Sequence, residues 1–173
     1  NIDSLSNLTN IKKLNFRSCK KLENVNVLIS CSNLTELNLS DCKKLQNVDG
    51  LKNNTKIKKL IMVNCEKLVH LNGLLNYINL TKLDLRNCKN LQNIDALINC
   101  RGLTELYLNY CENLRNVDAL INCTNLIKIS LKACKKLENL DGIKNCTNLT
   151  ELNLNLCKNL QNVDMLSKCV NLS

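Results

Sequence analysis

Hydrophobic residues recur along this chain with a period of 23 residues. We count each repeat from the leucine that opens segments such as LTELNLSDC, which starts at Leu34. Apolar residues or cysteine then occupy positions 1, 4, 6, 9, 12, 15, 18 and 21. Seven repeats follow one another without insertion or deletion over residues 11–171, and Asn54 is the one clearly polar residue at these positions. The chain is therefore a tandem array of one small unit.

Two spacings inside the repeat predict two local structures. Positions 4 and 6 are apolar and alternate with polar positions 5 and 7, which is typical of a short, half-buried strand. Positions 12, 15 and 18 are three residues apart, which is the spacing of a tight helical turn. Each repeat is thus predicted to be a strand and a return turn. Stacked repeats would share one core, with parallel strands about 4.7 to 4.9 Å apart.

The array is predicted to be a single domain over residues 1–173, with a partial repeat before the seven full repeats. The chain starts at position 14 of a repeat and stops at position 2 of another. Repeat proteins normally need polar caps, so we expect it to be a fragment of a longer chain or to meet a partner at its ends. The longest apolar run, residues 60–63, is far too short for a membrane span, and no membrane contact is expected.

Composition removes other all-β architectures. Aromatic residues make up 2% of the chain, there are four glycines, and there is no proline. Sandwiches and barrels built from hairpins need the turn chemistry that this chain lacks, so they are disfavoured.

The repeated motif resembles the leucine-rich repeat signature. L-x-x-L-x-L-x-x-C occurs at Leu34, Leu37, Leu39 and Cys42, and its pattern recurs in every repeat. The ninth-position cysteine is similar to the cysteine-containing repeats of F-box substrate receptors, whereas L-Q-N-V-D-G-L is similar to internalin-like repeats of bacterial surface proteins. The resemblance implies an α/β fold of the leucine-rich repeat class, a right-handed solenoid or horseshoe. Its parallel sheet would line a concave, protein-binding face, and short 3-10 or helical turns would lie on the convex face.

All twelve cysteines lie at positions 9 and 21 of the repeat. Asn54 and Tyr77 replace cysteine at position 21, yet their repeats keep Cys42 and Cys65, so the two columns do not behave as disulfide partners. We expect reduced, buried thiols and favour an intracellular, reducing compartment. Nine Asn-X-Ser/Thr sequons keep a secreted or cell-surface location as the alternative. Zinc sites need close cysteine pairs, which are missing, so we expect no metal and no cofactor.

Polar ladders at positions 14 and 16 have structural interpretations. The aspartates of position 16 are predicted to cap backbone amides of the return turn: Asp3, Asp49, Asp95, Asp118, Asp141 and Asp164. The asparagines of position 14 are predicted to bond to loop backbone, and His70, which replaces one of them, is interpreted as structural. One histidine and buried thiols cannot supply a nucleophile, a base and an orienting group. We therefore expect no catalytic residues and no enzyme.

Positive charge follows one edge of the predicted solenoid. The net charge is +9, from 24 basic and 15 acidic residues. Positions 10 and 11 concentrate lysines against two glutamates, Glu66 and Glu112, and these lysines are Lys20, Lys21, Lys43, Lys44, Lys67, Lys89, Lys135, Lys136 and Lys158. We interpret this edge as solvated, because no aromatic residue is interleaved there, and an anionic ligand is the alternative.

Positions 5, 7 and 8 change from repeat to repeat and are expected to face outward on the concave sheet. Apolar, aromatic and arginine side chains gather there in repeats three to six, as is typical of a binding centre. The predicted partner-binding residues are Ile61, Val63, Asp84, Arg86, Tyr107, Asn109, Tyr110 and Lys132. Two alternatives stay open: repeat drift on an unconstrained face, and a structural element that self-associates head to tail through its open ends.

Overall fold

The computed structural model describes residues 3–172, apart from the side chains of Asp3 and Ser6. Strands of three residues alternate with 3-10 turns along the described chain. The strands are β1 (Lys13–Asn15), β2 (Glu36–Asn38), β3 (Lys59–Ile61), β4 (Lys82–Asp84), β5 (Glu105–Tyr107), β6 (Lys128–Ser130) and β7 (Glu151–Asn153). The turns are η1 (Asp3–Asn7), η2 (Asn26–Ser30), η3 (Asp49–Leu51), η4 (Asn72–Leu74), η5 (Asp95–Asn99), η6 (Asp118–Asn122), η7 (Asp141–Ile143) and η8 (Asp164–Lys168).

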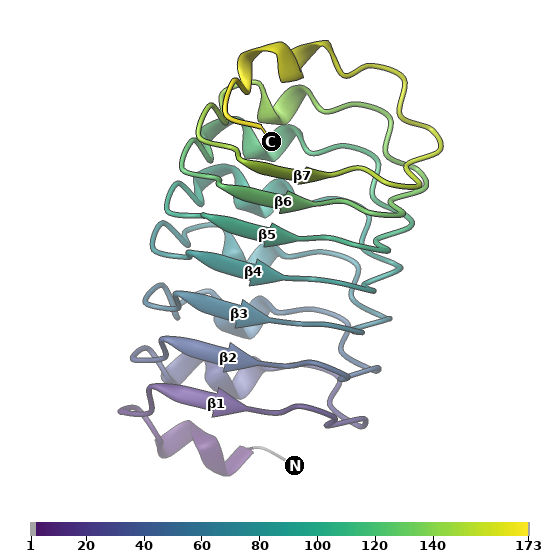
Figure 1. The fold of residues 1–173 in the computed structure, drawn as a ribbon. Helices are drawn as coiled ribbons and strands as arrows, with labels where there is room; N and C mark the ends of the chain where they lie inside the picture. Colours follow the sequence, from purple (N-terminus) through teal and green to yellow (C-terminus); the bar gives the residue numbers. More distant parts are fainter. Residues whose placement is uncertain (1–2, 173) are drawn as a thin grey trace.

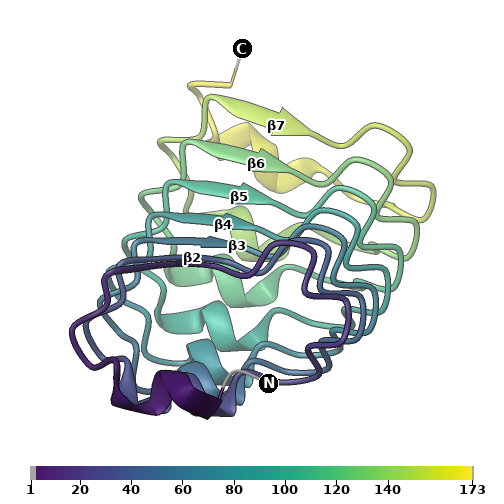
Figure 2. The same cartoon turned by 90° about the horizontal axis from the view of Figure 1, so that it is seen from below.

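The strands form one parallel sheet in chain order, from β1 to β7. The register between neighbours equals the repeat, so Leu60 lies opposite Leu83 and Ile61 opposite Asp84. Figure 1 shows this sheet along one face, with the 3-10 turns behind it. In Figure 2 the offset between successive coils grows toward β7, so the stack curves with its strands on the concave side. This is the solenoid that the sequence predicted.

The spacing of three residues arises from hydrogen bonds between residues i and i+3. Leu97 donates its N–H to Ile94 O (2.8 Å), and Cys100 in turn donates to Leu97 O (2.9 Å). Because a 3-10 turn has three residues per turn, its inward side chains fall on one line. No α-helix occurs among the described residues, so the return turns are of the 3-10 type throughout.

The core is a stack of identical layers. From repeat two to repeat six, the residues at positions 1, 4, 6, 9, 12, 15 and 18 are at most 1% exposed, as the periodicity predicted. Leu14 and Leu152, in β1 and β7, are only partly buried, because each packs against one neighbouring repeat instead of two. Burial in this fold is therefore a property of neighbouring repeats rather than of a single repeat.

The cysteines are hydrogen-bond donors as well as small apolar groups. All twelve are free thiols in the structure, and Cys19 and Cys157 are the two that are only half-buried. Each described position-9 thiol from Cys42 to Cys157 donates to the position-6 carbonyl of the preceding repeat, with Sγ–O distances of 3.1 to 3.2 Å. The constant cysteine at position 9 therefore links adjacent repeats through the core.

Position 21 selects a donor rather than a cysteine. Its side chain donates to the position-18 carbonyl of the preceding repeat. The Cys123 thiol, for example, donates to Leu97 O (3.5 Å). Asn54 Nδ2 makes the same contact to Leu28 O (3.0 Å), and Tyr77 Oη makes it to Leu51 O (2.8 Å). Asparagine and tyrosine can stand here because they also donate. The Oδ1 atom of Asn54 is buried without a hydrogen-bond partner, which is the one cost of that exchange.

The predicted capping role of the position-16 aspartates is wrong for all of them except Asp3, whose side chain lies outside the described part of the structure. In the described chain, no aspartate side chain at this position accepts a backbone amide; instead, the aspartate N–H donates to the Oδ1 atom of the asparagine two residues earlier. Asp118 N, for example, lies 3.2 Å from Asn116 Oδ1. The aspartate is the first residue inside the turn rather than the residue before it. Its carboxylate is therefore not placed to accept the free N–H groups at the start of that turn. The predicted role of the position-14 asparagines is confirmed.

Other asparagines connect neighbouring repeats. Side-chain amides at positions 20 and 23 donate to backbone carbonyls 24 residues earlier, as Asn125 Nδ2 does to Arg101 O (2.9 Å). These contacts explain why the chain is rich in asparagine. Six sequon asparagines use the Nδ2 atom that a glycan would occupy, namely Asn33, Asn79, Asn122, Asn145, Asn148 and Asn171.

Position 8 is a backbone corner. All seven of its residues have φ between 60° and 64°, although none of them is glycine. Asparagine and aspartate tolerate this left-handed conformation, whereas Tyr110, Ala133 and Leu156 adopt it at a cost. The chain leaves the sheet here, so the side chain at position 8 does not continue the strand alternation.

Candidate protein-binding site on the concave face

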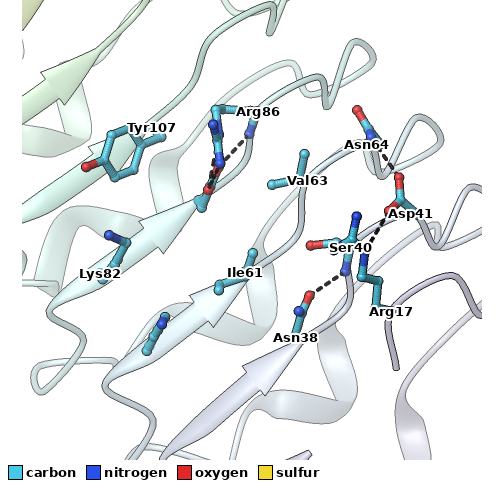
Figure 3. A pocket seen from close by; sticks show the side chains of 12 residues that line it. Arg17, Asn38, Ser40, Asp41, Ile61, Val63, Asn64, Lys82, Arg86 and Tyr107 are labelled. Carbon is cyan, nitrogen blue, oxygen red and sulfur yellow. Dashed lines mark hydrogen bonds and ion pairs between the residues drawn. The ribbon is translucent and has the colours of Figure 1, made fainter. Parts of the chain in front are cut away.

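An open hollow of about 590 Å³ lies on the concave face over the first five repeats. Five predicted binding residues line it: Ile61, Val63, Asp84, Arg86 and Tyr107. The other lining residues are Arg17, Asn38, Ser40, Asp41, Lys59, Asn64 and Lys82. Figure 3 shows these side chains projecting from neighbouring strands and from the segments that follow them. We refer to this feature as the concave hollow.

Ile61 and Val63 form the apolar floor of the concave hollow. They are the one pair of apolar residues at positions 5 and 7 in the seven repeats, and both are partly exposed. In four other repeats an Asn or Asp at position 5 accepts the N–H of position 7, as Asn38 Oδ1 does from Ser40 (2.9 Å). Ile61 cannot supply that acceptor, and a hydrogen bond of this kind contributes about 1 kcal/mol. The apolar floor therefore departs from the repeat at an energetic cost.

Asp84 positions Arg86 instead of facing a partner directly. Its side chain is 6% exposed, and it accepts two hydrogen bonds from Arg86 Nε (2.9 and 3.1 Å) and one from Nη2 (2.7 Å). This bidentate contact raises the pKa of Arg86 further above its ordinary value. The group of this pair that is open to solvent is the guanidinium.

Lys82, Glu105 and Tyr107 form an ordered wall on one side of the floor. Glu105 Oε2 accepts hydrogen bonds from Lys82 Nζ (2.5 Å) and from Tyr107 Oη (2.9 Å). The hydrogen bond from Lys82 lowers the pKa of Glu105, and burial together with Glu105 raises the pKa of Tyr107 to about 12. Lys82 Nζ and Arg86 Cζ lie 5.1 and 5.8 Å from the Tyr107 ring centroid. These contacts fix the orientation of the ring.

A second wall lies on the opposite side of the floor, around Asp41. Its carboxylate accepts a hydrogen bond from Asn64 Nδ2 (2.7 Å) and one from Arg17 Nε (3.3 Å). The contact with Asn64 is the main reason why the pKa of Asp41 is lowered. The apolar floor thus lies between two polar walls whose side chains are already paired.

Three predicted residues lie outside the concave hollow. Asn109 lines a neighbouring hollow that also includes Arg86 and Tyr107, and its Oδ1 atom is buried without a hydrogen-bond partner. Tyr110 stands at the left-handed corner, where its ring lies 5.9 Å from Lys132 Nζ. The structure therefore brings five of the eight predicted residues into one hollow and places Asn109, Tyr110 and Lys132 beside it.

Sequence reasoning missed the charged residues of position 3. This position opens each strand and carries, in order, Lys13, Glu36, Lys59, Lys82, Glu105, Lys128 and Glu151. Cross-strand ion pairs join Lys13 to Glu36 (2.7 Å) and Lys128 to Glu151. The near alternation of lysine and glutamate was the signal that could have revealed this ladder.

The lysine edge is partly neutralised by its own glutamates. Lys43 Nζ lies 3.0 Å from Glu66 Oε1, and Lys135 Nζ lies 2.9 Å from Glu112 Oε2 in the neighbouring repeat. These exposed pairs are typical of a solvated surface. An anionic ligand at this edge stays a prediction.

Metal ligation and membrane insertion are two further features of residues 3–172. No group of three or more His, Cys, Asp or Glu side chains there is arranged to hold a metal ion. Nor do these residues contain a helix that is long and apolar enough to cross a bilayer.

The sheet, the 3-10 return turns and the shared core define a leucine-rich repeat solenoid. The chain belongs to the BspA-type leucine-rich repeat family, whose model matches six copies over residues 1–92 and 76–173. Repeats of this class generally present concave surfaces for protein interactions. No curated protein matches the chain.

Solved structures share the fold at low sequence identity. Internalin C2 from Listeria monocytogenes str. 4b F2365 is 21% identical, with a TM-score of 0.65 over 94% of this chain and 78% of that chain. The leucine-rich repeat domain of the type III effector XopL is 17% identical, with a TM-score of 0.72 over 99% of this chain and 69% of that chain. These likenesses extend to the fold alone.

Proposed function

We propose that this protein is a non-enzymatic scaffold that binds another protein in the concave hollow. The observation that supports this most directly is the apolar floor, Ile61 and Val63, between two walls of paired polar side chains. Protein interfaces place their strongest contacts in such a centre, where a polar rim excludes water.

The ordered walls favour tight binding. A partner that immobilises a free side chain loses roughly 0.5 to 1.5 kcal/mol of binding free energy for each one. Asp84 already holds Arg86, and Glu105 already holds Tyr107. These two side chains are therefore ordered in the free protein, and binding loses less free energy on immobilising them.

The test exchanges the floor for the corresponding residues of repeat two. Ile61→Asn with Val63→Ser copies Asn38 and Ser40, which the fold already accommodates at these positions. A partner captured from native lysate with the wild-type protein should bind this variant at least 30-fold more weakly, because loss of a central contact costs about 2 kcal/mol or more. Unfolding curves should show that the variant is at least as stable as the wild type, because the new asparagine supplies the acceptor that Ile61 lacks.

The matched control neutralises four edge lysines, Lys43, Lys44, Lys135 and Lys136, to glutamine. This control should retain the partner and change mainly the salt dependence of binding. If the edge variant loses the partner and the floor variant retains it, the basic edge is the binding surface and the proposal is wrong.

Self-association through the ends of the stack is the second candidate. In the described chain β1 and β7 each pair on one side only, and Leu152, Leu154 and Leu160 are partly buried at one end. Sedimentation across a concentration series tests this candidate, and a strictly monomeric protein at high concentration counts against it.

A further inference from the structure

The charge ladder of position 3 contains one break, and it lies beside the concave hollow. Three neighbouring pairs form ion pairs, and they are Lys13–Glu36, Lys82–Glu105 and Lys128–Glu151. Lys59 is the member left over: among the described residues, no carboxylate lies within ion-pair distance of its Nζ atom.

Both neighbours of Lys59 in the sheet are unsuitable partners. Glu36, on β2, is held by Lys13, whose hydrogen bond is the main reason why its pKa is lowered. Lys82, on β4, is in register with Lys59 and carries the same charge. Like charges on neighbouring strands repel, but Glu105, which pairs with Lys82, and Glu36, on which the charge of Lys59 also acts, offset this repulsion.

Lys59 and Lys82 both line the concave hollow next to the apolar floor. Lys59 and Ile61 are the first and last residues of β3, so their side chains leave the same face of the sheet. The hollow therefore offers an ammonium group without an ion pair and an apolar surface side by side.

We infer that the concave hollow receives a segment of the partner protein that carries a carboxylate next to a large apolar side chain. The carboxylate binds between Lys59 and Lys82, and the apolar side chain packs on Ile61 and Val63. This inference rests on the proposed function and names the chemistry that the partner presents.

A carboxylate fits this hollow better than a phosphate group does. Arg17 and Arg86 are already engaged by Asp41 and Asp84, so the bidentate guanidinium contacts that phosphate favours are occupied. The same two aspartates would repel a dianion more strongly than a single carboxylate. Tyr107 is held by Lys82 and Arg86, so its ring is not free to stack on a nucleobase.

The experiment uses a displayed library of random twelve-residue peptides as the probe. The wild-type protein should enrich peptides in which Asp or Glu adjoins a large apolar residue. A synthetic peptide from this set should bind about tenfold more weakly to Lys59→Gln, and more weakly still to Lys59→Glu, at low ionic strength. The matched control, Lys128→Gln, removes a lysine from the same position outside the hollow and should bind the peptide normally.

A double-mutant cycle makes the contact specific. Changing the peptide's acidic residue to its amide should weaken binding to the wild type about as much as Lys59→Gln does, with little further loss when both changes are combined. Among residues 3–172 Lys59 has no ion pair, so Lys59→Gln should unfold at the same denaturant concentration as the wild type, and that result would exclude a folding defect.

Failure of the inference and failure of the proposed function give different results. If the selected peptides carry no acidic residue, or if the two changes are additive, the inference is wrong; the proposed function still stands when Ile61→Asn with Val63→Ser loses those peptides. If that floor variant binds them normally, the proposed function is wrong as well. Displacement of the peptide by an oligo(dT) strand, dependent on Lys59, would instead indicate a nucleic-acid site and overturn the inference.

Discussion

Each strand has an inner side, which faces the core, and an outer side, which faces solvent on the concave face. The two sides follow opposite rules. On the inner side, position 4 is Leu37, Leu60, Leu83 and Leu106 in successive strands, each at most 1% exposed. On the outer side, position 5 is Asn38, Ile61, Asp84 and Tyr107 in those strands. An inner side chain packs against copies of itself in two neighbouring repeats, so one change disturbs three layers. An outer side chain meets solvent or a partner, and the fold tolerates almost any residue there.

The concave face is itself uneven. In repeats three to five, positions 5 and 7 combine apolar, aromatic and ion-paired side chains, whereas β7 presents Asn153, followed by Asn155. The local backbone is the same in both regions, because Asp84 Oδ1 accepts the N–H of Arg86 as Asn153 Oδ1 accepts the N–H of Asn155. What differs between the two regions is chemistry rather than conformation, which is why we place binding in the first.

The largest effect expected on the inner side is loss of stability at alkaline pH. Burial raises the pKa of Cys42, Cys100, Cys123, Cys134 and Cys146 to about 12. Above about pH 9 the unfolded chain loses these protons while the folded protein keeps them, so the free energy of unfolding falls as pH rises. Each thiol contributes up to about 1.4 kcal/mol per pH unit. Urea unfolding between pH 8 and 11 should show a loss of several kcal/mol per unit.

Replacing one thiol sharpens this prediction. In Cys123→Ala the free energy of unfolding should fall less steeply with pH, by up to about 1.4 kcal/mol per pH unit, because one titrating thiol is gone. Native protein should react slowly with thiol reagents, and unfolded protein should titrate close to twelve thiols. Intact disulfides found by mass analysis, or a flat stability profile up to pH 11, would contradict the prediction of reduced, buried thiols.

The second prediction compares adjacent residues of β5. Leu106 is fully buried, so Leu106→Ala should lower the free energy of unfolding by about 2 to 5 kcal/mol. Tyr107→Asn, on the outer side, loses the contact with Glu105 but places an acceptor for the N–H of Asn109, as in repeat two. Its stability should stay within about 1 kcal/mol of the wild type. Chemical denaturation measures both, and equal losses would show that the two sides are not energetically distinct.

The smallest effect is a gain of stability at position 21. Asn54→Cys copies the residue of most other repeats and removes the buried, unpaired Oδ1 atom. We expect stabilisation of about 1 kcal/mol. This is less than the full cost of burying an unpaired oxygen, because the two hydrogen bonds that Asn54 Nδ2 donates are lost as well. Tyr77→Cys is the control: Tyr77 has no unpaired atom and fills a large volume, so that change should destabilise the protein. A loss of stability in Asn54→Cys would show that its amide contacts outweigh the orphaned oxygen.

Much of the fold could be predicted because the repeat reports each position seven times. The strand at positions 4 and 6, the turn with spacing three and the parallel stack all follow from the periodicity, and the structure confirms them. The aspartate caps were predicted wrongly, because the pattern places Asp118 next to a turn but does not show that it is the first residue inside the turn, with its own N–H donated to Asn116. The left-handed corner at position 8 was missed, since its seven residues include only a few, such as Asn64 and Asn87, that favour this conformation.

The sequence by itself determined the architecture, since a hydrophobic period of 23 residues can be satisfied only when neighbouring repeats cover one another. It also determined which side chains face outward, because strand alternation is local. Only the tertiary structure decided which outward residues act together. Lys82 and Glu105, or Asp41 and Asn64, are 23 residues apart and meet because their strands are in register. Pairing across repeats also leaves Lys59 without an ion pair in the described part of the chain, which becomes visible only when its neighbours' partners are known.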